Sequence, residues 1–265
     1  MFAIRGAFSK FFAADGFFLS AGLAFFFLVT MIPLVMLGVS VVGFVLTSQQ
    51  AASAIVDQLT RNFPVHTREI RTVLLRIVET RAVSGVLGTV ILVVFSTPLF
   101  SAARLVLHRM LGIRIPPSFF RSLLFDSGMV LIFAVLLFGA TVATWVFHWM
   151  EVFVLAPLEL SRAGIHAANI GFSIVLSAAM FYLGYRYVPR RRVRVGAALP
   201  GAIVASLLWE VAKQLFSLYI RKVGIYDQIY GPLGVLVAFI MFVYYSAVVF
   251  VFGSAYVAAL DARKR

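Results

Sequence analysis

Two oppositely charged side chains, Glu210 and Lys213, lie near the middle of an otherwise apolar run over residues 199–220. Their three-residue spacing places both on one face of a helix, where they can form an ion pair. Each charge at the centre of a membrane-spanning helix costs about 2.5–3.5 kcal/mol, so charges at this depth usually serve a function. The functional hypothesis is a polar lining of a cavity or substrate path. The alternative is a structural pair that ties helices together.

Three uncharged side chains are further candidates for the same path. Trp209 precedes Glu210 directly, and Tyr244 and Ser246 lie near the same depth in the next apolar run. Both hydroxyl groups could bond to Glu210 or face the cavity. The more common alternative is a buried hydroxyl that is satisfied by local packing.

Polar side chains outside the apolar runs form two groups. The first is a basic run: Arg190, Arg191, Arg192 and Arg194. It could bind lipid phosphate groups, but anchoring of the loop on the cytoplasmic face is the interpretation we favour. The second group is an acidic and aromatic turn: Tyr226, Asp227 and Tyr230. We interpret it as an outer turn with aromatic side chains at the membrane interface.

The remaining ionisable residues form no catalytic or metal-binding pattern. Four histidines are far apart and fall on different predicted sides of the membrane: His66, His108, His148 and His166. No HExxH motif, phosphate loop, dinucleotide fingerprint or nucleophile elbow is present. Cysteine is absent, which excludes disulfides and thiolate ligands. The sequence therefore predicts no catalytic residues, no metal and no cofactor, and the protein is not expected to be an enzyme.

Helices that use lipid as their solvent must hold these residues. The 265 residues are 62% hydrophobic and 12% charged, with a mean hydropathy of +1.02. A soluble domain is about half apolar and a quarter charged. The pattern predicts an all-α polytopic membrane protein, a single membrane domain over residues 1–265 with six transmembrane helices. Each predicted span reaches the length of about 20 residues that a bilayer requires. The spans cover about residues 17–46, 83–103, 123–147, 166–188, 199–220 and 232–260.

Shorter amphipathic helices are expected at two places. Residues 1–15 place Ile4, Phe8, Phe11 and Phe12 at helical spacing, which indicates an interfacial helix. Residues 49–81 indicate two short extracytoplasmic helices that are separated at Pro64. In the last span, proline at position 232 suits the first helical position. Small side chains near the end of that span predict close helix packing: Gly253, Ser254, Ala255 and Ala258.

The distribution of charge predicts the orientation. Basic side chains gather in four segments that the six spans place on one side, residues 5–10, 104–121, 186–194 and 263–265. Nearly all acidic loop residues fall on the other side. The positive-inside rule then places both termini in the cytoplasm. It also accounts for most of the net charge of +13, so that we expect membrane lipids as partners and no nucleic acid.

Three stretches resemble the YihY/virulence factor BrkB family of bacterial inner-membrane proteins. They are SAGLAFFFLVTMIPLVMLGV (20–39), LPGAIVASLLWEVAKQLFSLYI (199–220) and YGPLGVLVAFIMFVYYSAVVFVFGSAYVAAL (230–260). Pro232, where the family more often has serine, and Tyr245 depart from the pattern. The resemblance implies six transmembrane helices in the bacterial inner membrane, but it brings no settled activity.

Two functional hypotheses follow, and a third is set aside. The first is a transporter or flippase-like protein for a lipid or another amphipathic anionic molecule. It rests on Glu210 and Lys213, on the basic loops and on four intramembrane prolines: Pro33, Pro98, Pro200 and Pro232. The second is a non-catalytic envelope scaffold that docks partners through residues 49–81. The third is a ribonuclease, a label that related sequences have carried. It is not expected, because hydrolytic nucleases need clustered metal ligands.

Overall fold

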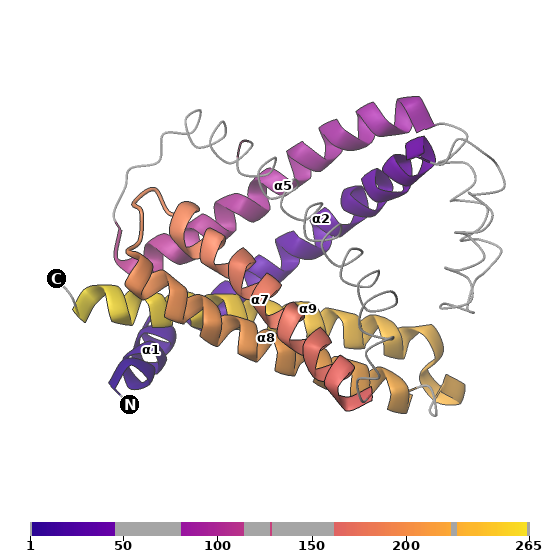
Figure 1. Ribbon diagram of the computed structural model, residues 1–265. Helices are drawn as coiled ribbons and strands as arrows, with labels where there is room; N and C mark the ends of the chain where they lie inside the picture. Colours follow the sequence, from indigo (N-terminus) through magenta and orange to yellow (C-terminus); the bar gives the residue numbers. More distant parts are fainter. Residues whose placement is uncertain (1, 46–80, 114–127, 129–161, 224–226, 264–265) are drawn as a thin grey trace. The chain divides into compact units, whose positions relative to one another are not determined.

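Six helices make up nearly all of the residues that the computed structural model describes, namely 2–45, 81–113, 128, 162–223 and 227–263. They are α1 (Phe2–Ala13), α2 (Gly16–Val45), α5 (Arg81–Leu111), α7 (Arg162–Tyr187), α8 (Val195–Val223) and α9 (Asp227–Arg263) (Figure 1). These ranges contain no strand, as expected of an all-α protein. The chain divides into two compact units, residues 1–24 with 100–265, and residues 25–99.

Three of the described helices contain segments long and apolar enough to cross a membrane. The segments are Ala167–Tyr187, Val195–Tyr219 and Leu236–Ala262. A fourth arises if α1 and the first half of α2, which meet at a bend of 72°, count as one span. The predicted spans 17–46 and 83–103 overlap α2 and α5. The described residues therefore bear out a helical membrane protein, while the count of six stays a prediction. The predicted span 123–147, apart from Gly128, and the helices of 49–81 lie almost entirely outside them.

The core of the first unit forms where α8 packs against α7 on one side and α9 on the other (Figure 1). Small residues let α8 and α9 approach closely. A Cβ on Gly201 would overlap the Val257 side chain, and a Cβ on Gly253 would overlap the Tyr185 hydroxyl. That hydroxyl donates a hydrogen bond of 3.0 Å to the carbonyl oxygen of Phe250. The predicted small-residue packing at this end of α9 is confirmed.

The N-terminal helix packs on the C-terminal turns of α9. Phe11 is buried there, and the Phe8 and Phe252 rings meet edge to face with centroids 5.0 Å apart. Asp15 adopts a positive φ of 55° between α1 and α2, where the chain turns. Ile4 and Phe12 remain exposed on α1. This pattern fits the predicted interfacial helix, since exposed apolar side chains can enter the bilayer surface.

Two predicted boundaries are wrong. The segment from Arg104, expected as a basic loop, continues α5 to Leu111 because Val106, Leu107 and Met110 are buried at helical spacing. The helix ends where the N–H of Gly112 bonds to the Arg109 carbonyl and the N–H of Ile113 to that of His108. This is the Schellman arrangement, with glycine at a φ of 66°.

The second wrong boundary is the start of the last helix. α9 begins at Asp227, five residues before the proline that was expected at its first position. A carboxylate is favourable at a helix N-terminus because it faces the positive end of the helix dipole. The residues expected as an outer turn therefore belong partly to the helix.

Candidate functional site

The short link of residues 188–194 joins α7 to α8, and the two helices pack antiparallel. The middle of one helix therefore lies beside the middle of the other. At a rise of about 1.5 Å per residue, Glu210 lies about 14 Å along α8 from Tyr219, where the apolar segment ends. Ser173 lies about 9 Å along α7 from the corresponding end at Ala167. Both side chains are therefore at a depth where hydrocarbon surrounds a membrane-spanning helix.

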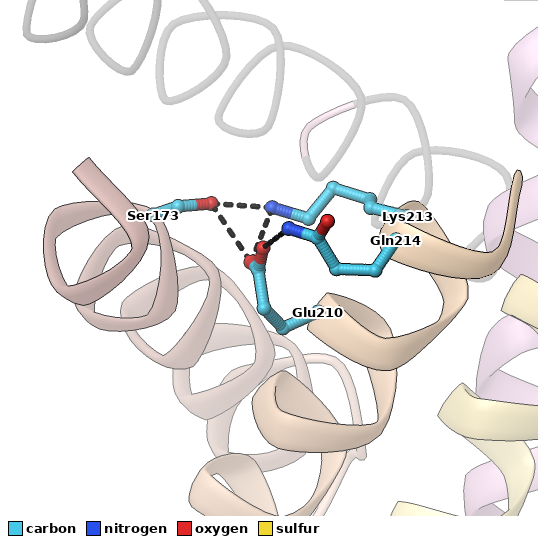
Figure 2. A network of polar contacts seen from close by, with 4 residues as sticks. All are labelled: Ser173, Glu210, Lys213 and Gln214. Carbon is cyan, nitrogen blue, oxygen red and sulfur yellow. Dashed lines mark hydrogen bonds and ion pairs between the residues drawn. The ribbon is translucent and has the colours of Figure 1, made fainter. Parts of the chain in front are cut away.

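Four polar side chains from the two helices join in one network, the polar cluster Ser173, Glu210, Lys213 and Gln214 (Figure 2). The Lys213 ammonium lies 2.6 Å from Glu210 Oε2 and also donates to the Ser173 hydroxyl. Ser173 Oγ donates to Glu210 Oε2 over 3.2 Å. The Gln214 amide donates to Glu210 Oε1 over 3.2 Å. The ion pair that the sequence predicts between Glu210 and Lys213 is thus formed, and Ser173 of α7 bonds to both of its members.

The two charges differ in exposure. The Glu210 side chain is 13% exposed and the Lys213 side chain is 32% exposed. Glu210 receives three donors, so its carboxylate is well satisfied although it is largely buried. Lys213 keeps a surface on which another polar group can bind. Chemically, the cluster offers an ammonium donor to an anion and a carboxylate acceptor to a proton or cation.

The other predicted path residues take part in different contacts. Trp209 packs against Phe181 of α7 and Phe242 of α9, with ring centroids 6.4 Å and 5.3 Å away. Ser246 donates to the carbonyl oxygen of Phe242 in its own helix over 2.6 Å. These contacts give both residues a packing role. Their share in a substrate path stays a prediction.

Tyr244 reaches a different part of the unit. Its hydroxyl lies 3.5 Å from the carbonyl oxygen of Phe17, in the first turn of α2. The described contacts thus place Tyr244 against the start of α2 and do not join it to Glu210. It too stays a predicted path residue without a described bond to the polar cluster.

The predicted arginine run occupies the link between α7 and α8, where each member has a different surrounding. The Arg190 backbone N–H donates to His108 Nε2 over 3.2 Å, which ties the link to α5. The Arg191 guanidinium pairs with the buried carboxylate of Asp261 in α9. Arg192 lies over the Tyr187 ring at 6.0 Å. The carbonyl oxygen of Arg194 accepts hydrogen bonds from the amides of Ala197 and Ala198 in the first turn of α8.

These contacts gather the predicted basic segments at one end of the first unit, which we call the basic end. Arg109 of α5 lies 3.4 Å from Asp15 after α1. The link joins α5 and α9, and α1 packs on α9. Burial lowers the pKa of His108, and the positive charges of Arg104 and Arg190 lower it further. A positive potential at this end is what the charge pattern predicts.

The predicted outer-turn residues lie at the opposite end of α9 and are only partly described. Asp227 is the first residue of α9 and Tyr230 belongs to its first turn, while Tyr226 lies outside the described residues. No group of three histidine, aspartate or glutamate side chains in the described ranges is arranged to hold a metal ion. The absence of a metal or cofactor site in the complete chain stays a prediction.

Two residues of the polar cluster were not singled out from the sequence, and Arg186 of the basic end was named only as part of the basic segment 186–194. Ser173 and Gln214 are uncharged, and only the packing of α7 on α8 reveals that they bond to Glu210. Arg186 lies at the end of α7, where its guanidinium stacks over Tyr182 and Tyr187 at 5.8 and 5.6 Å. Gln214 follows Glu210 by four residues, a helical spacing that could have indicated this bond.

Comparisons with known proteins agree with this architecture. The chain matches the family described as virulence factor BrkB over residues 7–265. A UPF0761 membrane protein of Chlorobium chlorochromatii is 32% identical over 257 residues, covering 94% of this chain and 57% of the relative. One of Pelodictyon phaeoclathratiforme is 30% identical over 264 residues, covering 97% and 60%. The chain thus spans somewhat less than two thirds of these relatives. No solved structure matches it.

The family match covers nearly the whole chain, and both relatives are named as membrane proteins. The long apolar helices of the structure agree with those names. The resemblance to YihY/BrkB proteins that the sequence motifs suggested is confirmed. The chain is an integral membrane protein of the virulence factor BrkB family.

Proposed function

We propose that the chain moves an amphipathic anionic molecule, a lipid in the simplest case, along a path that passes the polar cluster. The observation that carries the proposal is the network of Ser173, Glu210, Lys213 and Gln214 inside two apolar helices. Charged residues at membrane depth typically line pathways for ions or substrates. The network therefore supports a polar contact point on a path rather than a plain helix contact.

The exposure of Lys213 supports transport over a purely structural pair. A pair that only neutralises itself is most stable when it is fully packed, because an ammonium group in contact with hydrocarbon is costly. Lys213 instead keeps about a third of its side chain exposed. Water or an anionic substrate group at this surface would satisfy its remaining donor.

The basic end supports an anionic substrate. Arginine side chains of α5, α7 and the link gather there, as Arg109, Arg186, Arg190, Arg191 and Arg192. Such a surface attracts phosphate headgroups and other anions. By the positive-inside rule we place this end, with both termini, on the cytoplasmic side of a bacterial inner membrane.

The test is lipid movement in reconstituted liposomes. An anionic phospholipid with a fluorescent headgroup is placed in both leaflets, and an impermeant reductant then bleaches the outer leaflet. We expect the wild type to bring inner-leaflet dye to the surface, and Glu210→Gln to move it no faster than protein-free liposomes. Ser206→Ala is the matched control, because among the described contacts its hydroxyl donates only to the carbonyl oxygen of Ile203 in its own helix. That variant should retain wild-type movement.

A second measurement covers substrates other than phospholipids. Species that co-purify with the protein in mild detergent are identified by mass spectrometry, and an anionic amphiphile enriched over the bulk membrane is expected. Bleaching no faster than in protein-free liposomes, together with no enriched amphiphile, would refute the proposal. An enriched protein partner in its place would favour the scaffold hypothesis.

We further propose that the chain does not cleave RNA. A hydrolytic nuclease needs side chains that hold a metal or activate water, and the sequence has no such pattern. Purified protein should give no more cleavage than a mock preparation from cells lacking the chain. Metal-dependent cleavage that one point substitution in this chain abolishes would contradict the proposal.

A further inference from the structure

Arg186, at the end of α7, carries buried hydrogen-bond donors that the described chain does not satisfy. Its Nε and Nη1 atoms have almost no exposed surface and no hydrogen-bond partner among the described residues. The guanidinium lies over the rings of Tyr182 and Tyr187, at 5.8 and 5.6 Å from their centroids. Stacking favours the cation but offers no acceptor to its N–H groups. A buried donor without an acceptor is costly, and more so when it is charged.

A second guanidinium shares one of these rings. Arg192 lies 6.0 Å from the centroid of Tyr187, so two arginines lie within about 6 Å of the same aromatic ring. Both Tyr187 and Arg192 are exposed. An anion can therefore approach the Tyr187 ring from the side of Arg192.

Three carboxylates of the described chain have other partners, and the fourth residue lies at the far end of α9. The four are Asp15, Glu210, Asp227 and Asp261. Asp15 pairs with Arg109, and Asp261 pairs with Arg191. Glu210 belongs to the polar cluster, and Asp227 begins α9 at its opposite end. The charges of Arg186 and Arg192 thus have no counterion in the described ranges, although their neighbour Arg191 has one.

We propose that Arg186 and Arg192, whose guanidinium groups both lie within about 6 Å of the Tyr187 ring centroid, form a binding site for a phosphate group at the basic end. The planar guanidinium of Arg186 can form a fork of Nη2 with either Nε or Nη1, and a phosphate accepts such a fork through two oxygens. Arg192 supplies the second charge from the exposed side. The site takes a phosphate monoester or diester, from a lipid headgroup or from a soluble phosphate.

This inference goes beyond the proposed transport. Arg186 lies about 20 Å along α7 from Ser173 of the polar cluster, at about 1.5 Å per residue. The site binds phosphate whether or not the polar cluster moves a substrate. Glu210→Gln should therefore abolish lipid movement and leave phosphate binding unchanged, which separates a failure of one proposal from a failure of the other.

The experiment measures thermal unfolding of the detergent-solubilised chain against ligand concentration at constant ionic strength. One arm uses inorganic phosphate and the other uses short-chain phosphatidylglycerol in a neutral detergent. A ligand that binds the folded state raises the unfolding temperature in a saturable way. We expect saturation in at least one arm. Saturation by inorganic phosphate identifies a site open to soluble phosphates, and saturation by phosphatidylglycerol alone identifies a headgroup site.

Matched variants separate the site from general attraction to a basic protein. Arg186→Gln with Arg192→Gln should weaken binding about tenfold or more, because charge-assisted hydrogen bonds are lost. Arg5→Gln with Lys10→Gln removes the same charge elsewhere at the basic end and should change binding less than about twofold. Arg192→Gln alone removes only an exposed side chain and keeps the test valid if Arg186 is needed for folding.

Three results would overturn the site. They are the absence of saturation with either ligand, equal weakening in the two double variants, and binding that appears only after Asp126→Asn. The last result would mean that Asp126, which follows the basic segment 104–121 at the start of the predicted span 123–147, already satisfies Arg186. Arg186→Lys gives the converse check, since a lysine keeps the charge but lacks the fork, and it should bind markedly more weakly than the wild type.

Discussion

Glu210 is a largely buried carboxylate within an apolar helix, so its bonding partners matter for stability. Three donors from Ser173, Lys213 and Gln214 satisfy it. Each of these bonds would be replaced by water on a soluble protein, but hydrocarbon offers no such replacement. Removal of one member of this network therefore leaves a polar or charged group of the others without a hydrogen-bond partner, which is unfavourable in hydrocarbon.

Substitutions of the charged pair separate a structural from a functional role. Glu210→Gln strands the Lys213 ammonium, and we expect a loss of stability below the about 3–5 kcal/mol of a fully buried pair, since Lys213 is partly exposed. Glu210→Gln with Lys213→Met should recover the stability measured by thermal unfolding in detergent. We expect the double variant to remain inactive in lipid movement, because the substrate needs the lost groups. A double variant with wild-type movement would show that the pair is structural.

His108 gives a prediction about pH. Its Nε2 accepts the Arg190 N–H, and burial, then Arg104, then Arg190 lower its pKa. Between this lowered value and the usual value of about 6.5, the unfolded chain binds more protons than the folded chain. Stability should therefore fall as the pH decreases below about 6.5.

The measurement is the unfolding temperature in detergent between neutral and mildly acidic pH. His108→Gln keeps an acceptor for Arg190 but does not titrate, so it should lose less stability on acidification than the wild type. The difference between the two proteins isolates His108 from the other three histidines. Identical pH profiles would contradict the assignment.

Among the helices, α8 and α9 owe their close approach to two glycines. Gly201 and Gly253 each face a side chain of the neighbouring helices, so that no Cβ fits without displacement. In lipid, such contacts replace the hydrophobic effect as the force between helices. Together with the Tyr185 hydrogen bond to Phe250, they fix α7, α8 and α9 at the level of the basic end.

Gly253→Ala should therefore destabilise the protein. The new Cβ overlaps the Tyr185 hydroxyl and lies 3.0 Å from Ala205 Cβ. Overpacking of this kind costs about 1–3 kcal/mol, which exceeds the gain in helix propensity of about 1 kcal/mol. Gly171→Ala is the control, because no atom lies within 4 Å of its added Cβ. It should unfold at or above the wild-type temperature. Equal effects of the two substitutions would argue against the packing described.

At the scale of the whole molecule, the described contacts at the basic end bring basic segments together that are far apart in the sequence. The first helix packs on the last, Arg109 meets Asp15, and the link contacts both α5 and α9. A membrane protein tolerates such a concentration of positive charge on one side, where anionic lipids compensate it. This arrangement supports the proposal that these segments share the cytoplasmic face.

Labelling with single cysteines tests that orientation directly. Cysteine is absent from the chain, so each introduced thiol is the only one. Cysteines at Gln49 and Ser161 should react with an impermeant reagent added to intact cells. Cysteines at Ser118 and Val195 should react only after the membrane is opened. The reverse pattern would place both termini outside and refute the topology.

Much of this architecture can be predicted from the order of residues. Long apolar runs predict helices α2, α7 and α8 within a few residues, because only a helix satisfies its own backbone in lipid. The spacing of Glu210 and Lys213 predicts their ion pair, since both belong to one helix. The boundaries of α5 and α9 could not be predicted, because packing and helix capping extend a helix beyond its apolar part.

Contacts between helices depend on the folded arrangement. Ser173 joins Glu210, Arg191 joins Asp261, and Gly253 makes room for Tyr185, although 37, 70 and 68 residues separate them in the chain. Helical periodicity fixes which residues share a face, but it does not fix which faces meet. The partner of each face depends on the shapes of all the helices together. The proposed role of Arg186 and Arg192 depends on this arrangement, since both meet Tyr187 where α7 ends and the link turns back toward α8.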